Sequence, residues 1–269
     1  EFQSMIGELT GFEMVSAPVY DWASAVTSAL MMAARITGRR KVLAPRAMST
    51  EKLGHMRTTG MAQIDVTEIG FDPETGGLDL GELRHALDGE TAAVYLEVPS
   101  FFGIIEADAA EIARIAHDAG ALFVVGVDAI SLGVLAPPAD YGADLVAGEA
   151  QALGVHMQNS GGLCGFIASR DEARFLDEYH YLMVSIAPGM IPGELGFGWS
   201  TMARTSYDKR EHSRDFAGTT QWLWGITAAV YLSLLGPRGL REVGEGIVQR
   251  VHYAAGKLDA IPGVRAPLF

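Results

Sequence analysis

Residues 91–98 read Thr-Ala-Ala-Val-Tyr-Leu-Glu-Val, an almost continuously apolar run of the length of one strand. A strand of this composition is buried on both faces, which is typical of a parallel sheet covered by helices. Residues 121–127 read Ala-Leu-Phe-Val-Val-Gly-Val and repeat the pattern. Shorter strands are expected along the rest of the chain, at residues 41–44, 62–69, 143–147 and 162–168.

Helical patterns lie between these strands. Asp21 can cap a helix that runs to about Thr37, and further helices are expected at residues 50–60, 78–87 and 107–119. The alternation of strand and helix predicts an α/β fold with a doubly wound, mainly parallel sheet. Because ligands of such sheets bind at the carboxyl ends of the strands, we expect three loops to converge on the site, those at 99–105, 128–133 and 148–154.

The sequence changes character after Arg170. Residues 186–198 are rich in Gly and Pro and are expected to form a loop with exposed apolar side chains. Two helices should follow, over residues 216–235 and 238–261, because Gly236-Pro237 interrupts the helical pattern.

We therefore divide the chain into two parts. Residues 1–215 are expected to form a large domain, and residues 216–269 are expected to lead into a smaller C-terminal domain. The chain starts within a helical pattern without an initiator Met, and its last residues read as the start of a new segment. These features suggest a piece of a longer polypeptide, with parts of both domains outside this sequence.

Composition narrows the class of protein. The chain has 269 residues, which suits one large α/β domain, and its 20 basic and 33 acidic residues give a net charge of −13. That charge argues against nucleic acid and anionic membranes as partners. The single cysteine, Cys164, excludes an intrachain disulfide and indicates a reducing compartment, so we expect a cytoplasmic protein. There is no signal peptide and no run of eighteen apolar residues.

Two residues are candidates for ligand binding on chemical grounds. Asp128 ends an apolar strand, where a buried carboxylate requires a partner such as a cofactor N–H, although a capping aspartate is an open alternative. Ser24 lies in the first turn of the helix that Asp21 caps, and a helix start with a hydroxyl can bind a phosphate. A plain helix cap is the better interpretation there, because Trp22 fills the space a phosphate would need and Asp21 adds negative charge.

Several other chemistries find no support. The seven histidines show no metal-ligand spacing, so we expect no metal site. Cys164 lies in an apolar strand and is expected to be an inert core thiol. No phosphate-binding loop, dinucleotide fingerprint or nucleophile elbow is present. In Pro99-Ser-Phe-Phe-Gly103 two adjacent aromatic side chains cannot both face one core, so we expect one of them to meet a partner or a cofactor.

Several segments together resemble the glycine cleavage system P-protein family, the pyridoxal-phosphate-dependent glycine dehydrogenases (decarboxylating), and in particular their alpha half or subunit 1. The similar segments occur in family order and cover almost the whole chain: residues 1–11, Tyr20-Asp21, Pro99-Ser-Phe-Phe-Gly-Ile-Ile-Glu106, Val127-Asp-Ala-Ile-Ser-Leu-Gly133, residues 138–144, Gly148-Glu-Ala-Gln-Ala-Leu-Gly154 and residues 229–240.

The resemblance implies the large domain of a fold-type-I pyridoxal-phosphate-dependent transferase. Gln151 then occupies the place of the lysine that forms the Schiff base, and a glutamine amide cannot form an imine. The family's lysine belongs to the beta subunit, so this chain would contribute no catalytic residue. By the resemblance, Ser24, Asp128 and Gln151 are the residues at the cofactor, which the partner subunit would hold covalently.

The implied activity is glycine decarboxylation with transfer of the aminomethyl group to a lipoyl H-protein. The expected partners are the glycine dehydrogenase beta subunit (subunit 2) and the H-protein. The sequence departs from the family's pattern at Trp22-Ala-Ser24, at Ser100 and over residues 212–221. Two alternatives therefore stay open. One is a diverged, non-catalytic binding or scaffold subunit in another pathway, and the other is an independent enzyme that uses one of the four lysines, Lys41, Lys52, Lys209 or Lys257.

Overall fold

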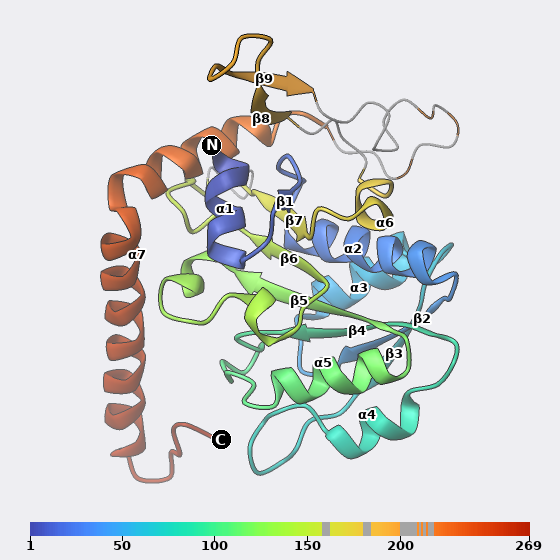
Figure 1. The fold of residues 1–269 in the computed structure, drawn as a ribbon. Coiled ribbons are helices and arrows are strands. Elements are labelled where there is room, and N and C mark those ends of the chain that lie inside the picture. Colours follow the sequence, from blue (N-terminus) through green and yellow to red (C-terminus); the bar gives the residue numbers. More distant parts are fainter. Residues whose placement is uncertain (158–161, 180–183, 200–208, 210, 212–213, 215–217) are drawn as a thin grey trace.

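The computed structural model describes residues 1–269 except 158–161, 180–183, 200–208, 210, 212–213 and 215–217 (Figure 1). Residues 212–221, which depart from the family's pattern, therefore lie partly outside the described residues. The elements, in chain order, are α1 (Phe2–Thr10), β1 (Met14–Val15), α2 (Trp22–Thr37), β2 (Lys41–Pro45), α3 (Thr50–Thr59), β3 (Asp65–Ile69), α4 (Leu80–Ala86), β4 (Thr91–Glu97), α5 (Ala109–Asp118), β5 (Leu122–Asp128), η1 (Ala129–Gly133), η2 (Pro138–Tyr141), β6 (Leu145–Glu149), β7 (Gly165–Ser169), α6 (Ala173–Leu176), β8 (Val184–Pro188), β9 (Leu195–Trp199) and α7 (Trp222–Asp259).

Seven strands form one sheet in the order β1-β7-β6-β5-β4-β2-β3. The five strands from β6 to β3 are mutually parallel, whereas β7 pairs antiparallel with both β6 and β1. The predicted α/β fold with a mainly parallel sheet is therefore confirmed. The antiparallel edge was not predicted, because β1 is only two residues long and carries no periodicity of its own.

Helices cover both faces of the sheet. In β4, Val94 and Leu96 pack into a core with α1, α5 and the first part of α7. The alternate residues Ala93 and Tyr95 pack into a second core with α2 and α3. Period-two alternation thus delivers an apolar side chain to each core, which is why an unbroken apolar run was the signature of this strand (Figure 1).

Two expectations for the C-terminal part meet different outcomes. Residues 186–198 are not a loop: they belong mostly to a hairpin in which β8 and β9 pair antiparallel, with Ile186 opposite Phe197. Pairing between residues 184–188 and 195–199 defines the strands, and several of the Gly and Pro residues that suggested a loop lie in the turn between them. The predicted break at Gly236-Pro237 is confirmed, because Gly236 has non-helical angles (φ 59°, ψ −178°) inside α7. The division at residues 215 and 216 stays a prediction.

Gly126 in β5 is a position where the core requires a glycine. A Cβ at Gly126 would lie 2.2 Å from the Tyr95 hydroxyl of the neighbouring strand β4. That hydroxyl cannot move away freely, because Tyr95 is fully buried and donates a hydrogen bond to Glu97 at 3.0 Å. The phenol ring of Tyr95 in β4 therefore fills the space that a side chain at position 126 of β5 would need.

We expect Gly126→Ala to lower the free energy of unfolding by about 1–3 kcal/mol, the usual cost of overpacking a core. Gly54→Ala in α3 is the matched control, since a Cβ at Gly54 meets nothing within 4 Å. The control should raise stability by about 0.5–1 kcal/mol through the helix preference of alanine. Denaturant unfolding of both variants measures the difference, and equal midpoints would contradict the packing described for Tyr95.

Candidate functional site

Three acidic residues end three neighbouring strands. β4 ends at Glu97, β5 at Asp128 and β6 at Glu149, and Asp128 lies opposite Glu149 in the register. Since the strands are parallel, the loops that follow them start from one edge of the sheet, as predicted. Of these three residues, only Asp128 was predicted from the sequence. Glu97 and Glu149 carried the same signal, an acidic residue that closes an apolar strand, and could have been found by it.

Glu149 connects three separate segments through its carboxylate. Its Oε1 accepts hydrogen bonds from the backbone N–H of Gln151 at 2.9 Å and of Cys164 at 2.7 Å. Its Oε2 accepts one from the backbone N–H of Trp22, the first residue of α2, at 3.1 Å. Burial raises the pKa of the Glu149 carboxyl to about 7, although the three N–H donors act in the opposite direction.

At the amino-terminal end of α2 the sequence favoured a plain helix cap over a phosphate site, and the structure places protein carboxylates there. Asp21 caps the helix and accepts the backbone N–H of Ser24 at 2.7 Å. The carboxylate of Glu149 accepts the N–H of Trp22. The two negative groups thus satisfy the N–H groups that a phosphate would use and complement the positive end of the helix dipole.

Gln151 is held within its own loop. Its side-chain amide donates to the carbonyl of Val155 at 2.6 Å, and its backbone carbonyl accepts the Val155 N–H at 3.1 Å. The same loop meets α7, because a Cβ at Gly154 would lie 2.8 Å from the Tyr231 ring. The side-chain amide of Gln151, which stands in place of the expected lysine, therefore stabilises the turn from Gln151 to Val155, and α7 packs against this turn.

A buried ion pair with an aromatic cover lies near the same edge. Lys52 Nζ is 2.5 Å from Glu97 Oε1, and the side chains are only 13% and 2% exposed. The Tyr95 hydroxyl donates to the same carboxylate, and the Lys52 ammonium lies 3.7 Å from the centroid of the Trp22 ring. One of the four lysines therefore does lie close to the start of α2, but its charge is used by Glu97 and covered by Trp22.

These contacts test whether the expected cofactor fits this chain. Pyridoxal phosphate needs a cradle for its phosphate, a lysine amine and an acceptor for its pyridinium N–H. The cradle is taken by Asp21 and Glu149, and Gln151 supplies no amine. Asp128 suits the third role: it accepts the N–H of Ile130 at 3.2 Å, and burial raises its pKa. Two of the three requirements are not met here, so this chain by itself does not provide a complete site for pyridoxal phosphate.

The assignment of Ser24, Asp128 and Gln151 to cofactor binding accordingly stays a prediction. The structure brings all three to one edge of the sheet: Ser24 lies in the first turn of α2, whose first residue bonds to Glu149, Asp128 ends β5, and Gln151 follows the adjacent strand β6. The other sequence-based expectation, the inert thiol, agrees with the structure. Cys164 is buried, and burial raises the pKa of its thiol to about 12.

The aromatic loop after β4 contributes an exposed patch. Phe101 is 60% exposed, whereas Phe102 packs edge-on against Phe71, with ring centroids 5.0 Å apart, and lies 5.4 Å from the Phe269 ring. One aromatic side chain is thus engaged within the chain and the other faces outward. That Phe101 meets a partner or a cofactor stays a prediction.

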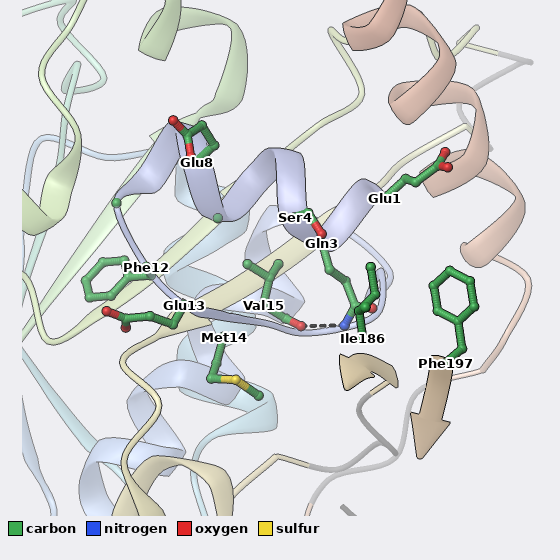
Figure 2. A pocket seen from close by; sticks show the side chains of 12 residues that line it. Glu1, Gln3, Ser4, Glu8, Phe12, Glu13, Met14, Val15, Ile186 and Phe197 are labelled. Carbon is green, nitrogen blue, oxygen red and sulfur yellow. Dashed lines mark hydrogen bonds between the residues drawn. The ribbon is translucent and has the colours of Figure 1, made fainter. Parts of the chain in front are cut away.

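A cavity of about 780 Å³ lies away from the strand ends, between α1 and the β8–β9 hairpin (Figure 2). Glu8 and Glu13 lie on one wall, and Ile186 and Phe197 of the hairpin lie on the other.

Within the described parts of the chain, no three His, Cys, Asp or Glu side chains are grouped so that they could bind a metal. Among the helices described, none combines the length and the apolar character needed to cross a membrane.

Comparison with known proteins gives a consistent result. The family model described as glycine cleavage system P-protein matches residues 1–264. Among curated relatives, the "Probable glycine dehydrogenase (decarboxylating) subunit 1" of Aeropyrum pernix is 38% identical over 271 residues, covering 100% of this chain and 58% of the relative. The protein of the same name from Thermococcus onnurineus is 37% identical over 262 residues, covering 97% of this chain and 58% of the relative. The chain thus spans just under three fifths of the length of these relatives.

Solved structures agree. An inhibitor-bound glycine decarboxylase (P-protein) of the glycine cleavage system superposes with a TM-score of 0.87 at 33% identity, covering 97% of this chain and 58% of that one. A sphingosine-1-phosphate lyase from Burkholderia pseudomallei, at a TM-score of 0.68 and 14% identity, shares the fold alone over 97% of this chain and 60% of its own. The order of the strands, the site at their carboxyl ends and the match over nearly the whole sequence lead to one conclusion: this chain belongs to the glycine cleavage system P-protein family.

Proposed function

We propose that this chain is part of subunit 1 of a glycine dehydrogenase (decarboxylating). In this proposal it acts with a second, lysine-bearing subunit to decarboxylate glycine and to pass the aminomethyl group to a lipoyl H-protein. The observation that carries the proposal is Gln151 within an otherwise family-like site, where its amide is bonded to Val155 rather than left available for chemistry. The names of the relatives, each a "subunit 1", support a second subunit.

Pyridoxal phosphate supplies an electron sink for decarboxylation of an amino acid, and we assign it to the second subunit. In this chain the carboxylates of Asp21 and Glu149 satisfy the N–H groups at the start of α2 and so make a second phosphate site unfavourable there. Lys52 does not replace the missing amine, because its ammonium is buried against Glu97. The role left to this chain is to stabilise the assembly and to shape the surface that faces the partner.

In this proposal, activity requires both subunits together. Neither subunit alone should release carbon dioxide from carboxyl-labelled glycine in the presence of lipoyl H-protein, whereas the mixture should. Replacing the Schiff-base lysine of the second subunit by alanine should abolish release. Gln151→Ala in this chain should change the rate by no more than about twofold, because its amide acts within the loop and makes no bond that is specific to the transition state.

Two outcomes would contradict the proposal. If this chain alone released labelled carbon dioxide, it would be an independent enzyme, and the Lys52→Met variant would show whether Lys52 is its amine. If the two subunits assembled but the complex bound pyridoxal phosphate without acting on glycine, the scaffold alternative would stand instead.

The stability of this chain should depend on pH through Glu149. The pKa of Glu149 is raised in the folded protein from 4.5 to about 7, so between these values the folded state holds more protons than the unfolded state. The free energy of unfolding should therefore fall as the pH rises from 4.5 to 7, by ~3 kcal/mol at most, since each pH unit of difference corresponds to ~1.4 kcal/mol.

The Glu149→Gln variant should lack this pH-dependent share of its stability, while the exposed control Glu13→Gln should keep it. Denaturant unfolding at intervals from pH 4.5 to pH 8 measures the slope for each protein. Parallel slopes for the Glu149→Gln variant and the unaltered chain would show that the Glu149 carboxyl is not the titrating group.

A further inference from the structure

Of the four lysines in this chain, Lys52 is the one whose amine contacts a strand end at the candidate site. It projects from α3, and its Nζ pairs with the carboxylate that ends β4. The other three lysines lie elsewhere: Lys41 begins β2 at the opposite edge of the sheet, Lys209 pairs with Asp177 after α6, and Lys257 lies in the last turn of α7. Imine chemistry by a lysine of this chain at the strand ends would therefore have to start from Lys52.

A buried carboxylate holds Lys52 as an ammonium. Its Nζ lies 2.5 Å from Glu97 Oε1, and the Tyr95 hydroxyl donates to the same oxygen at 3.0 Å. An amine attacks a carbonyl only through a free lone pair, so the ammonium must lose a proton before it can react. An uncharged Lys52 would leave the Glu97 charge in the interior without its counter-ion, which is unfavourable. The ion pair is thus a first barrier to reaction.

The Trp22 ring provides a second barrier. Its centroid lies 3.7 Å from Lys52 Nζ, within the range of a cation–π contact. This contact stabilises the charged form of the amine, and the ring fills space beside the nitrogen that an incoming carbonyl would need. Glu97 is 2% exposed and Tyr95 is fully buried, whereas Trp22 is only partly buried. The ring is therefore the part of this cluster that meets solvent.

The backbone at position 22 is fixed by bonds that do not involve the ring. The Trp22 N–H donates to Glu149 Oε2 at 3.1 Å, and the Asp21 carboxylate caps the helix by accepting the Ser24 N–H at 2.7 Å. Any non-proline residue at position 22 can make the first of these bonds, and the second does not depend on that residue. The ring can therefore be replaced while the start of α2 is retained.

Without its cover, Lys52 has the chemistry that an imine requires. The deprotonated amine would add its lone pair to the carbon of an aldehyde. Loss of one water molecule from the adduct would then form the C=N bond, and the proton released by the ammonium would pass to solvent. Amine and aldehyde thus give imine and water, with no oxidant and no reductant.

We propose that Lys52 is a latent imine-forming amine and that Trp22 is the side chain that keeps it from reacting with aldehydes. Trp22 is thus a residue that determines selectivity, and it takes no part in catalysis itself. The biological meaning of this inference rests on the proposed function, because an aldehyde cofactor is expected only in that assembly. Trp22 would then confine imine formation to the lysine of the second subunit.

Reductive alkylation of the full chain tests the amine directly. Propanal forms an imine with an accessible amine, cyanoborohydride reduces the imine to a stable secondary amine, and mass spectrometry of peptides gives the labelling rate of each lysine. In the unaltered chain the exposed Lys257 should react readily and Lys52 slowly. Trp22→Ala should raise the rate at Lys52 at least about tenfold, as expected for loss of a partly desolvated cation–π contact.

Two controls accompany this measurement. Trp22→Phe keeps an aromatic face over the ammonium, so Lys52 should stay nearly as slow as in the unaltered chain. Lys41 reports whether the chain is folded, because its amine is bonded to the Ala86 carbonyl and to Asp88. If Trp22→Ala also raises labelling of Lys41, that variant has unfolded. Trp22→Leu, which fills the space without an aromatic face, then takes its place.

The outcomes separate this inference from the proposed function. If Lys52 stays slow in folded Trp22→Ala, or if Trp22→Phe exposes it equally, the ring is not the cover and the inference is overturned. The proposed function then stands, because the assay contains no second subunit. Labelling of Lys52 in the unaltered chain as fast as Lys257 also overturns the inference. If borohydride traps pyridoxal phosphate on Lys52 of the unaltered chain, Lys52 is the amine of an independent enzyme and both proposals fail.

Discussion

The carboxylate of Glu149 is the contact on which the arrangement of the site depends. It accepts three backbone N–H groups, from the start of α2, from the Gln151 loop and from the residue before β7. Trp22 and Cys164 are more than a hundred residues apart in the sequence, and one carboxylate pairs with the N–H groups of both. A single acidic side chain at the end of β6 thus fixes how a helix, a loop and an antiparallel strand meet.

The same contact explains why this chain has the fold of a cofactor enzyme and yet does not by itself provide a complete phosphate site. A helix start and a strand end form an anion site in either case, because unpaired N–H groups and the helix dipole favour negative charge. Here Asp21 and Glu149 provide that charge from within the chain. Lys52 and Glu97 neutralise each other beneath Trp22, so the neighbouring buried charges are also satisfied internally.

Helix α7 links the site to the outside of the molecule. Its small inner residues, Gly225 and Ala228 among them, allow the helix to lie close to the body, and Tyr231 contacts Gly154 directly. Its outer face is equally apolar. In the described part of the chain the inner face of this helix is buried and the outer face is exposed.

The sequence by itself determined the parallel core of the sheet, because period-two burial on both faces leaves an unbroken apolar run in strands such as β4. It also determined the break at Gly236-Pro237 and the absence of an amine at Gln151, which are properties of single residues. Tertiary structure decided the rest. The two-residue strand β1 and the β8–β9 hairpin depend on pairing with other segments. The bond of Glu149 to Trp22 spans 127 residues, and the approach of Lys52 to Glu97 joins a helix to a strand end. Such contacts are set by how packed elements meet in space, and no local periodicity records them.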